Sequence, residues 1–299
     1  MANVYEVITD RIMEKLTQEV VPWQKPWNST AGMPRNLLSQ KPYRGINVWV
    51  LASAGYSSPY WLTFKQAQEI GGHVSKGEHG YPVVFWKWLE RSEETQDREG
   101  ENESRRVPMA RLYTVFNAYQ CELPERLQPF LQIDNALDTD THRQIAACEQ
   151  IVATMPLRPA IQHGEARAYY RPATDTLNMP ERRLFPKVEH YYSVLFHELT
   201  HSTGHTSRLD RATLRDLLAF GDTNYSKEEL CAEMGAAYLC GMAGIVNETV
   251  DNSAAYIQGW LSKLRNDKKL LVQAAAQAQK AADYILGKDA NQKEETLDN

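Results

Sequence analysis

Residues 197–201 read His-Glu-Leu-Thr-His and directly follow the mostly apolar run Tyr-Tyr-Ser-Val-Leu-Phe at 191–196. On a helix, residues four apart lie on the same face, so His197 and His201 can reach one metal ion. Glu198 lies beside the open coordination position, where it can take a proton from water. This HExxH spacing is typical of zinc-dependent hydrolases. We therefore predict two histidine metal ligands and a catalytic Glu198.

A catalytic zinc site needs a third protein ligand and one open position. His205 is a poor candidate, because it lies past Gly204, where we expect the helix to end. A second predicted helix begins at Ser226 and carries Glu229 and Glu233 one turn apart on one face. Each glutamate has another interpretation: Glu229 could close a capping box with Ser226, and Glu233 could orient a metal-bound histidine. From the residues alone, Glu229 and Glu233 are about equally good candidates for the third metal ligand.

The second informative feature is an N-terminal segment rich in tryptophan and cations. Six of the seven tryptophans lie within residues 23–88, and residues 21–88 hold seven Lys or Arg against two acids, a local charge of +5. This composition suits single-stranded nucleic acid, since bases stack on rings while cations contact phosphates. Tryptophan is also common in cores, so composition alone does not decide. The candidate DNA contacts are Trp23, Lys25, Trp27, Arg35, Lys41, Tyr43, Arg44, Trp61, Thr63, Lys65, Gln66 and Lys76.

The bulk composition is that of a globular protein, with 42% hydrophobic and 24% charged residues in a chain long enough for two domains. The net charge of −5 argues against a uniformly basic surface. The four cysteines form no CxxC pair, which predicts free, mostly buried thiols in a reducing compartment. We find no secretory signal and no apolar run approaching 18 residues, so we expect a cytoplasmic protein without a membrane partner.

Hydrophobic periodicity and turn residues predict the secondary structure. We expect strands over 46–51, 81–88 and 112–116, and a short helix capped by Thr63 that runs to Ile70. The charged stretch 89–107 is predicted to be a solvated hairpin loop, and residues 120–135 are a linker candidate. The remaining predicted elements are a helix over 4–20, a helix over about 139–154, a β segment over 166–179, the helix from Ser226 to about Leu239, and long alanine-rich helical sequence over 253–286.

The metal-site motifs resemble a known family. Residues 197–205, followed by Ser-Arg-Leu at 207–209 and by residues 228–233, are similar to the zincin-type metallopeptidase domain of the ArdC antirestriction family. Related gluzincin-like domains take their third ligand from the glutamate of an E-x-x-A helix, and residues 229–232 read Glu-Leu-Cys-Ala. The resemblance therefore implies Glu229 as the third ligand, with Glu233 as the second choice. Zinc is the expected divalent metal, and manganese is possible with this ligand set.

The N-terminal motifs resemble the same family. They comprise Pro-Trp-Gln-Lys-Pro-Trp at 22–27, Pro-Arg-Asn at 34–36 and the segments 43–47, 61–67 and 71–78. Members of the family bind single-stranded DNA through this domain, and similar modules occur in plasmid primase proteins. The two resemblances together cover nearly the whole chain, apart from the charged insert at 89–107.

We therefore expect an α+β protein of two domains. Residues 1–125 would form an α/β module that binds single-stranded DNA, residues 136–287 a zincin-like metallopeptidase fold, and residues 288–299 a polar tail. The resemblance implies an antirestriction protein of conjugative plasmids that protects incoming DNA from host restriction. Its expected partners are single-stranded DNA and an unidentified protein substrate or restriction-system component.

Two alternatives belong to other functional classes. In the first, the protein binds single-stranded DNA and blocks restriction without catalysis, and the zincin domain is a metal-stabilised scaffold. In the second, it is a housekeeping peptidase whose aromatic domain recognises protein. The complete HExxH set favours catalysis over the scaffold. The cations among the tryptophans favour DNA over a protein partner.

Overall fold

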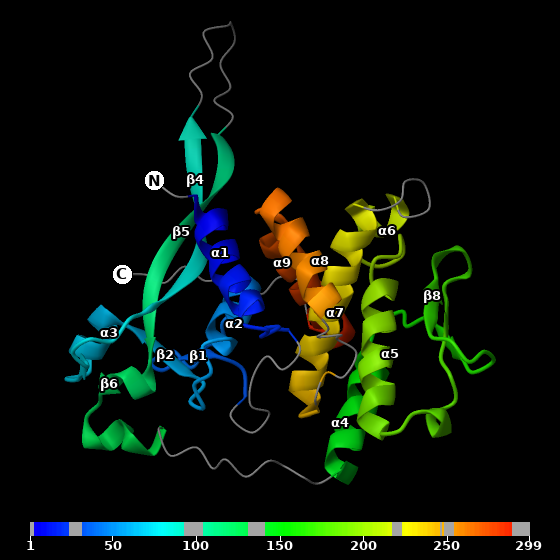
Figure 1. The fold of residues 1–299 in the computed structure, drawn as a ribbon, viewed down its shortest axis with the longest axis horizontal. Coiled ribbons are helices and arrows are strands. Elements are labelled where there is room, and N and C mark those ends of the chain that lie inside the picture. Colours follow the sequence, from blue (N-terminus) through cyan, green and yellow to red (C-terminus); the bar gives the residue numbers. More distant parts are fainter. Residues whose placement is uncertain are drawn as a thin grey trace, which may run out of the picture.

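The computed structural model describes residues 3–23, 32–92, 104–130, 141–216, 223–245, 247 and 254–288. Helices and strands are mixed throughout these residues, as the sequence predicts (Figure 1). A long hairpin and small sheets dominate the N-terminal half, while helices dominate the C-terminal half. Within the described residues, no helix combines the length and apolarity that a membrane span requires.

The N-terminal half contains a four-stranded sheet in the order β1-β2-β5-β4. Strand β2 pairs parallel to β1 and antiparallel to β5, and β5 pairs antiparallel to β4. A separate antiparallel pair joins β3 to β6. The bounds of these elements are α1 Val4–Thr17, β1 Arg35–Asn36, α2 Ile46–Ala52, β2 Tyr60–Thr63, α3 Phe64–Glu69, β3 His73–Val74, β4 Tyr81–Ser92, β5 Ser104–Asn117 and β6 Cys121–Glu122.

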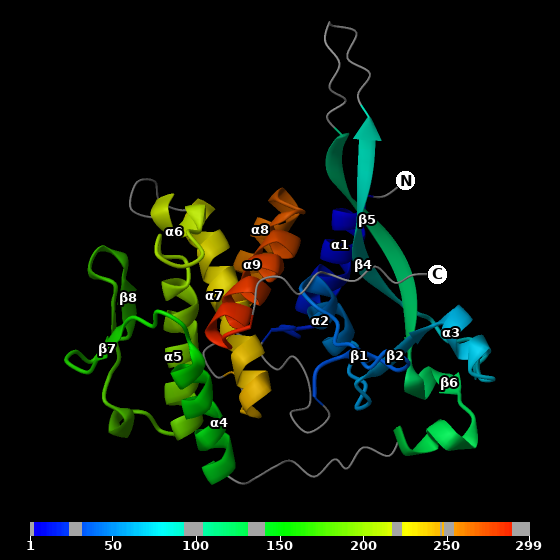
Figure 2. The same cartoon turned by 180° about the vertical axis from the view of Figure 1, so that it is seen from behind.

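The C-terminal half consists of helices flanked by a three-stranded sheet in the order β7-β9-β8. The central strand β9 pairs parallel to β7 and antiparallel to β8. This small sheet lies at the edge of the molecule beside α5 (Figures 1 and 2). The bounds are α4 Thr141–Thr154, β7 Ala160–Gln162, β8 Tyr169–Arg171, β9 Thr176–Asn178, α5 Val188–Ser202, α6 Ala212–Asp216, α7 Thr223–Ala243, α8 Ala254–Asn266 and α9 Leu270–Ile285.

The two halves share one hydrophobic core. Its cluster of buried side chains runs from Ile8 on α1 to Ile285 on α9. Helix α1 packs against α8 and α9, and α2 also packs against α9 (Figure 2). A smaller cluster, which includes Leu62 and Cys121, lies under α3. The two predicted domains are therefore packed against each other through a common core.

Several predicted elements are confirmed. Thr63 and Gln66 form a capping box at the start of α3, and Ile70 is the C-cap residue of that helix. The β segment over 166–179 contains β8 and β9, with a turn between them. All four cysteines are buried and free. The charged stretch 89–107 contributes to the paired strands at both of its ends, while residues 93–103 lie outside the described residues.

The predicted strand over 46–51 is wrong, because these residues form helix α2. All of its residues from Ile46 to Leu51 are buried, between β4 and α9. A helix that is covered on all sides is apolar all round, so its sequence lacks the helical period and reads like a buried strand. The alanine-rich stretch is also divided into α8 and α9. The carboxylate of Asp267 accepts the backbone N–H groups of Lys269 and Leu270 at that break.

Candidate metal centre and DNA-contact residues

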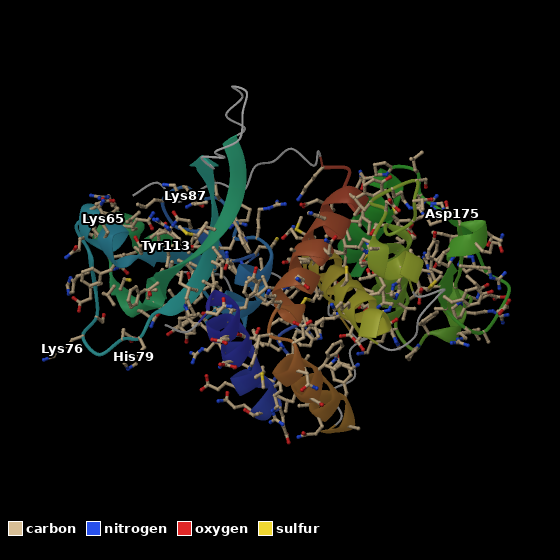
Figure 3. All side chains as sticks on the ribbon, turned by 90° about the horizontal axis from the view of Figure 1, so that it is seen from above. Lys65, Lys76, His79, Lys87, Tyr113 and Asp175 are labelled. Carbon is tan, nitrogen blue, oxygen red and sulfur yellow. The ribbon has the colours of Figure 1, made fainter. Side chains whose placement is uncertain are left out.

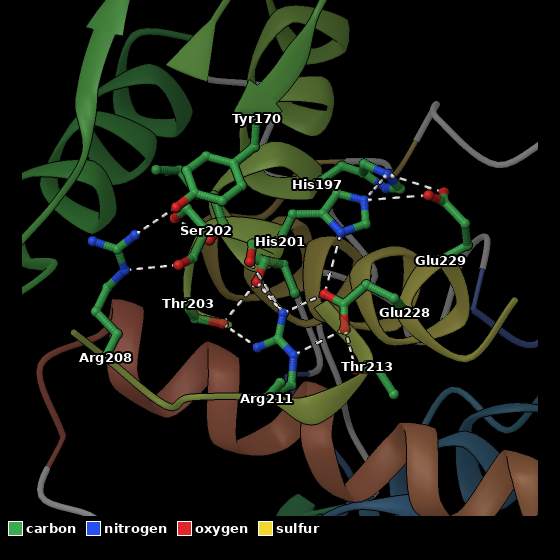
Figure 4. A network of polar contacts seen from close by, with 12 residues as sticks. Tyr170, His197, His201, Ser202, Thr203, Arg208, Arg211, Thr213, Glu228 and Glu229 are labelled. Carbon is green, nitrogen blue, oxygen red and sulfur yellow. Dashed lines mark hydrogen bonds and ion pairs between the residues drawn. The ribbon is translucent and has the colours of Figure 1, made fainter. Parts of the chain in front are cut away.

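Helices α5 and α7 bring three possible metal ligands together. His197 and His201 lie one turn apart on α5, and their Nε2 atoms are 3.1 Å apart. Glu229 on α7 faces both: its carboxylate oxygens lie 3.6 Å from Nε2 of His197 and 3.5 Å from Nε2 of His201. Figure 4 shows the two imidazoles and this carboxylate converging on one point. Among the described residues, these three side chains are the group that could hold a metal ion.

The spacing of these atoms fits a small divalent cation. Two ligand atoms about 2.1 Å from a tetrahedral ion are separated by about 3.4 Å. The three observed separations, from 3.1 to 3.6 Å, lie around that value. Two imidazole nitrogens and a carboxylate suit zinc and also suit manganese. The residues present therefore fit the ion that the HExxH motif implies.

A buried carboxylate holds the second histidine. Oε1 of Glu228 lies 3.2 Å from Nδ1 of His201, and Glu228 is fully buried. Nε of Arg211 donates to Oε2 of Glu228 at 3.1 Å, and Thr213 donates to the same oxygen at 2.6 Å. Figure 4 shows this network as a chain from His201 to Arg211. It fixes the imidazole so that Nε2 points toward Glu229.

The charges in this network are mutually stabilised. Burial alone would raise the pKa of Glu228, but hydrogen bonds from His201 and Arg211 hold it far below its ordinary value. Burial alone would lower the pKa of His201, but the hydrogen bond to Glu228 raises it. No motif in the sequence predicted a role for Glu228 or Arg211. The available signal was the adjacent acidic pair at 228–229. Glu228 faces Nδ1 of His201, and Glu229 faces Nε2 of the same ring.

Glu198, the predicted general base, is partly exposed on α5. It lies close enough to His201 for its charge to act on that imidazole. Helix α7 begins at Thr223, so the capping box considered for Ser226 and Glu229 does not form the start of this helix. Glu233 lies outside the converging group, because one of its oxygens accepts hydrogen bonds from Trp23 and Tyr256.

His205 follows the end of α5, and its Nδ1 atom lies 2.8 Å from the hydroxyl of Ser207. It does not join the ligand group. Nearby, the guanidinium of Arg208 clamps the end of α5 by donating to the backbone oxygen of Ser202 at 2.7 Å and to the carboxylate of Asp175 at 3.0 Å. This clamp ties α5 to the small sheet, since Asp175 lies between β8 and β9.

The predicted stacking residues are mostly buried. Trp23 and Trp61 are 0% and 1% exposed, and Tyr43 is 5% exposed. A base cannot stack on a ring that the core already covers, so these three do not offer a DNA surface in this conformation. They belong to the hydrophobic core. Trp27 and Lys25 lie outside the described residues.

Several predicted polar contacts already serve the fold. Arg44 forms an ion pair with Asp283 of α9, which joins the two halves. Thr63 and Gln66 bond to each other in the capping box of α3. Arg35 is partly buried and donates to the backbone oxygen of Met33.

The remaining predicted cations are accessible to a DNA strand. Lys41, Lys65 and Lys76 are exposed. Figure 3 shows Lys65 and Lys76 at the end of the N-terminal half, with Asp175 at the opposite end of the molecule. Among the residues of this half whose side chains the structure describes, Phe64 is 51% exposed and Tyr119 is 46% exposed. Neither ring was among the predicted stacking residues, because composition does not show which rings the core covers.

Comparisons with known proteins match both halves. A family model for the N-terminal domain of anti-restriction factor ArdC matches residues 2–116, and a zincin-like metallopeptidase model matches residues 146–277. An uncharacterized protein of Sinorhizobium fredii, y4eC, is 34% identical over 95% of this chain and 91% of its own length. Two DNA primases TraC of Escherichia coli are 34% identical over 97% of this chain. The chain spans only 28% and 20% of their lengths.

Two solved structures are similar over the whole fold. Both are crystal structures of the antirestriction ArdC protein from the R388 plasmid, one metal-free and one with Mn(II) bound. The metal-free structure is 39% identical, with a TM-score of 0.73, and the match covers 95% of this chain and 97% of that one. The Mn(II)-bound structure is 38% identical, with a TM-score of 0.74, over 98% and 100% of the two chains.

Proposed function

This chain belongs to the ArdC antirestriction family, and from that membership we propose that it binds single-stranded DNA and hydrolyses peptide bonds at a metal centre. Together these activities would protect incoming plasmid DNA from host restriction in the cytoplasm. The single observation that carries the catalytic part is the convergence of His197, His201 and Glu229, with Glu198 close enough to His201 for its charge to act on that imidazole. A bare scaffold has no need for a general base at that position.

The residues of the site would divide the work as follows. His197, His201 and Glu229 would hold one divalent cation, zinc or manganese. When bound, that cation supplies Lewis-acid polarisation of a carbonyl and makes water a stronger nucleophile. Glu198 would accept the proton of the attacking water and pass it to the leaving amine. Glu228 and Arg211 would keep His201 oriented throughout.

An extended peptide could pair with the edge of the small sheet. Two stretches of the predicted β segment precede the HExxH helix and are candidates for this pairing, residues 166–170 and residues 177–179. Strand β9 is paired on both sides, so the stretch 177–179 is wrong as an edge. Strand β8 is an edge strand and packs against α5, the helix of the HExxH motif. We propose β8 as the strand that holds a substrate backbone through its free N–H and C=O groups.

Single-stranded DNA would bind the end of the N-terminal half. The exposed cations Lys41, Lys65 and Lys76 would contact phosphates, and the exposed ring of Phe64 would stack on a base. The substrate of the peptidase site would then be a protein bound to the same DNA, such as a component of the restriction system.

The decisive experiment compares restriction of a transferred plasmid in cells carrying the wild type or the Glu198→Gln variant. Metal content and single-stranded DNA affinity of both proteins are measured beforehand. The Gln side chain keeps the shape of the site but cannot accept the proton, so we expect normal metal and DNA binding with loss of protection. If protection survives, the protein works by binding alone and the metal centre is a scaffold.

A further inference from the structure

One face of the long hairpin carries rings and cations side by side. Strand β4 pairs Phe85 with Arg111 of β5, and Lys87 and Tyr113 lie two positions further along their strands. Residues two apart on a strand share a face of the sheet, and so do residues that pair directly across two strands. These four residues therefore lie on one face of the ribbon. None of them is among the DNA contacts predicted from the sequence.

The core supports the rings on this face. Tyr43 is 5% exposed, and its ring centroid lies 6.3 Å from that of Phe85. Phe85 in turn meets Tyr113 edge-on, with 5.6 Å between the ring centroids. Tyr113 is partly exposed, and its hydroxyl has no hydrogen-bond partner among the described residues. A ring that is supported in this way loses little conformational freedom when a base stacks on it.

The cations beside these rings can contact an anion. Lys87 and Arg111 are exposed, and within the described part of the chain neither has an ion-pair partner. The next positions on the same face further out along the hairpin are those of Arg91 and Arg105, which pair with each other. Like charges at directly paired positions are unfavourable in isolation, so this row favours an anionic partner.

The row begins near a cation that is already proposed to contact DNA. Thr63 of β2 pairs with Val115 of β5, two positions from Tyr113, and Lys65 follows Thr63 in the first turn of α3. Figure 3 shows Lys65, Tyr113 and Lys87 at one end of the molecule, opposite Asp175. Cations therefore lie on both sides of the Tyr113 ring, as a strand of alternating bases and phosphates requires.

We propose that single-stranded DNA runs over this face of the hairpin, with a base stacked on Tyr113 and phosphates bound by Lys87 and Arg111. The inference rests on the proposed binding of single-stranded DNA and gives that DNA a path from α3 along β5 and β4. A single strand fits this face better than a duplex, because its unstacked bases can lie on an exposed ring.

The test measures the affinity of the full-length protein for a fluorescein-labelled oligothymidine by anisotropy at several salt concentrations. Tyr113→Leu removes the ring, so we expect the affinity to fall roughly 5- to 150-fold, the range for one stacked base. Tyr113→Phe keeps the ring and should bind within about twofold of the wild type. Lys87→Gln and Arg111→Gln should each reduce the slope of log affinity against log salt by about 0.7, the value for one phosphate contact on a single strand.

The matched control is Arg167→Gln, which removes an exposed cation directly before β8 in the other half and should change neither affinity nor slope. Circular dichroism and thermal melting establish that each variant folds. If Tyr113→Leu does not fold, the variants of Lys87 and Arg111 decide the matter, because both side chains are exposed and their loss leaves the core intact.

Affinities and salt slopes equal to those of the wild type in the folded variants of Tyr113, Lys87 and Arg111 would overturn the proposed path. A wild-type protein that does not bind the oligonucleotide would instead remove the proposed DNA-binding function, and this path with it. The two failures are distinguishable, because the second is seen without any substitution.

Discussion

Nδ1 of His201 lies 3.2 Å from Oε1 of Glu228, and that same carboxylate neutralises the buried guanidinium of Arg211. One side chain therefore orients a proposed metal ligand and compensates a charge in the interior. Isolated buried charges are costly, because the lost hydration is not replaced. The metal centre and the stability of the fold depend on the same carboxylate.

The first prediction concerns this shared carboxylate. Glu228→Gln removes the negative charge and leaves Arg211 charged but uncompensated, so we expect the free energy of unfolding to fall by about 3–5 kcal/mol. Urea denaturation of the metal-free protein measures this loss. The control is Glu69→Gln on α3, whose carboxylate is 54% exposed and should contribute less than about 1 kcal/mol. Equal losses for the two variants would contradict the assignment.

The second prediction concerns the contact between α5 and α7. A Cβ atom on Gly235 would lie 2.4 Å from Cγ2 and 2.7 Å from Oγ1 of Thr200, much closer than atoms can pack. Gly235→Ala should therefore separate the two helices and destabilise the protein by about 1–3 kcal/mol. Metal affinity should fall as well, because the ligands come from both helices.

Thermal melting checks this prediction against two further variants. Gly259 on α8 has open space around the equivalent atom, so Gly259→Ala should stabilise the protein by about 0.5–1 kcal/mol. Adding Thr200→Ala to Gly235→Ala removes both clashing atoms and should recover metal affinity. A double variant that is no better than Gly235→Ala would show that the clash is not the cause.

The third prediction concerns acid stability. The hydrogen bond from Arg208 lowers the pKa of Asp175 below its ordinary value of 3.8. A carboxylate whose pKa is lower in the folded state stabilises the fold above pH 3.8, and this contribution disappears as the pH falls through the lowered value. Thermal melting between pH 5 and pH 2.5 should show a steeper loss for the wild type than for Asp175→Asn. Asn also tolerates the left-handed backbone that Asp175 adopts, with φ of 49°. Parallel curves for the two proteins would refute the prediction.

The closeness of His197 and His201 could be read from the sequence, because it depends only on local geometry. The four-residue spacing of His197 and His201 on a helix places both on one face, whatever the rest of the chain does. Local geometry does not decide whether Glu229 or Glu233 is the third ligand, because both lie on the same face of α7. Only the docking of α7 on α5 separates them, and it sets Glu229 against both histidines.

Several of the predicted DNA-contact side chains are buried or paired in the fold, for a related reason. Trp23, Trp61 and Tyr43 have the composition of a stacking surface, but amphipathic rings serve equally well in a core. Likewise, Arg44 is a cation by sequence and an ion-pair partner of Asp283 in the fold, 239 residues further along the chain. Which side of a sheet or helix is covered depends on contacts between distant segments, which no local pattern contains.

The last prediction separates exposed rings from buried ones in DNA binding. Phe64 is 51% exposed and precedes Lys65, so a base can stack on the ring while the ammonium group contacts a phosphate. Phe64→Ala should weaken binding of a single-stranded oligonucleotide by about 1–3 kcal/mol, without loss of stability comparable to a core variant. Lys65→Glu should weaken binding too, and should reduce its dependence on salt, because fewer counterions are released. Trp61→Phe should lower the melting temperature instead and leave DNA affinity unchanged. Fluorescence anisotropy at several salt concentrations measures all three variants, and full affinity in the Phe64 and Lys65 variants would place the DNA on another face.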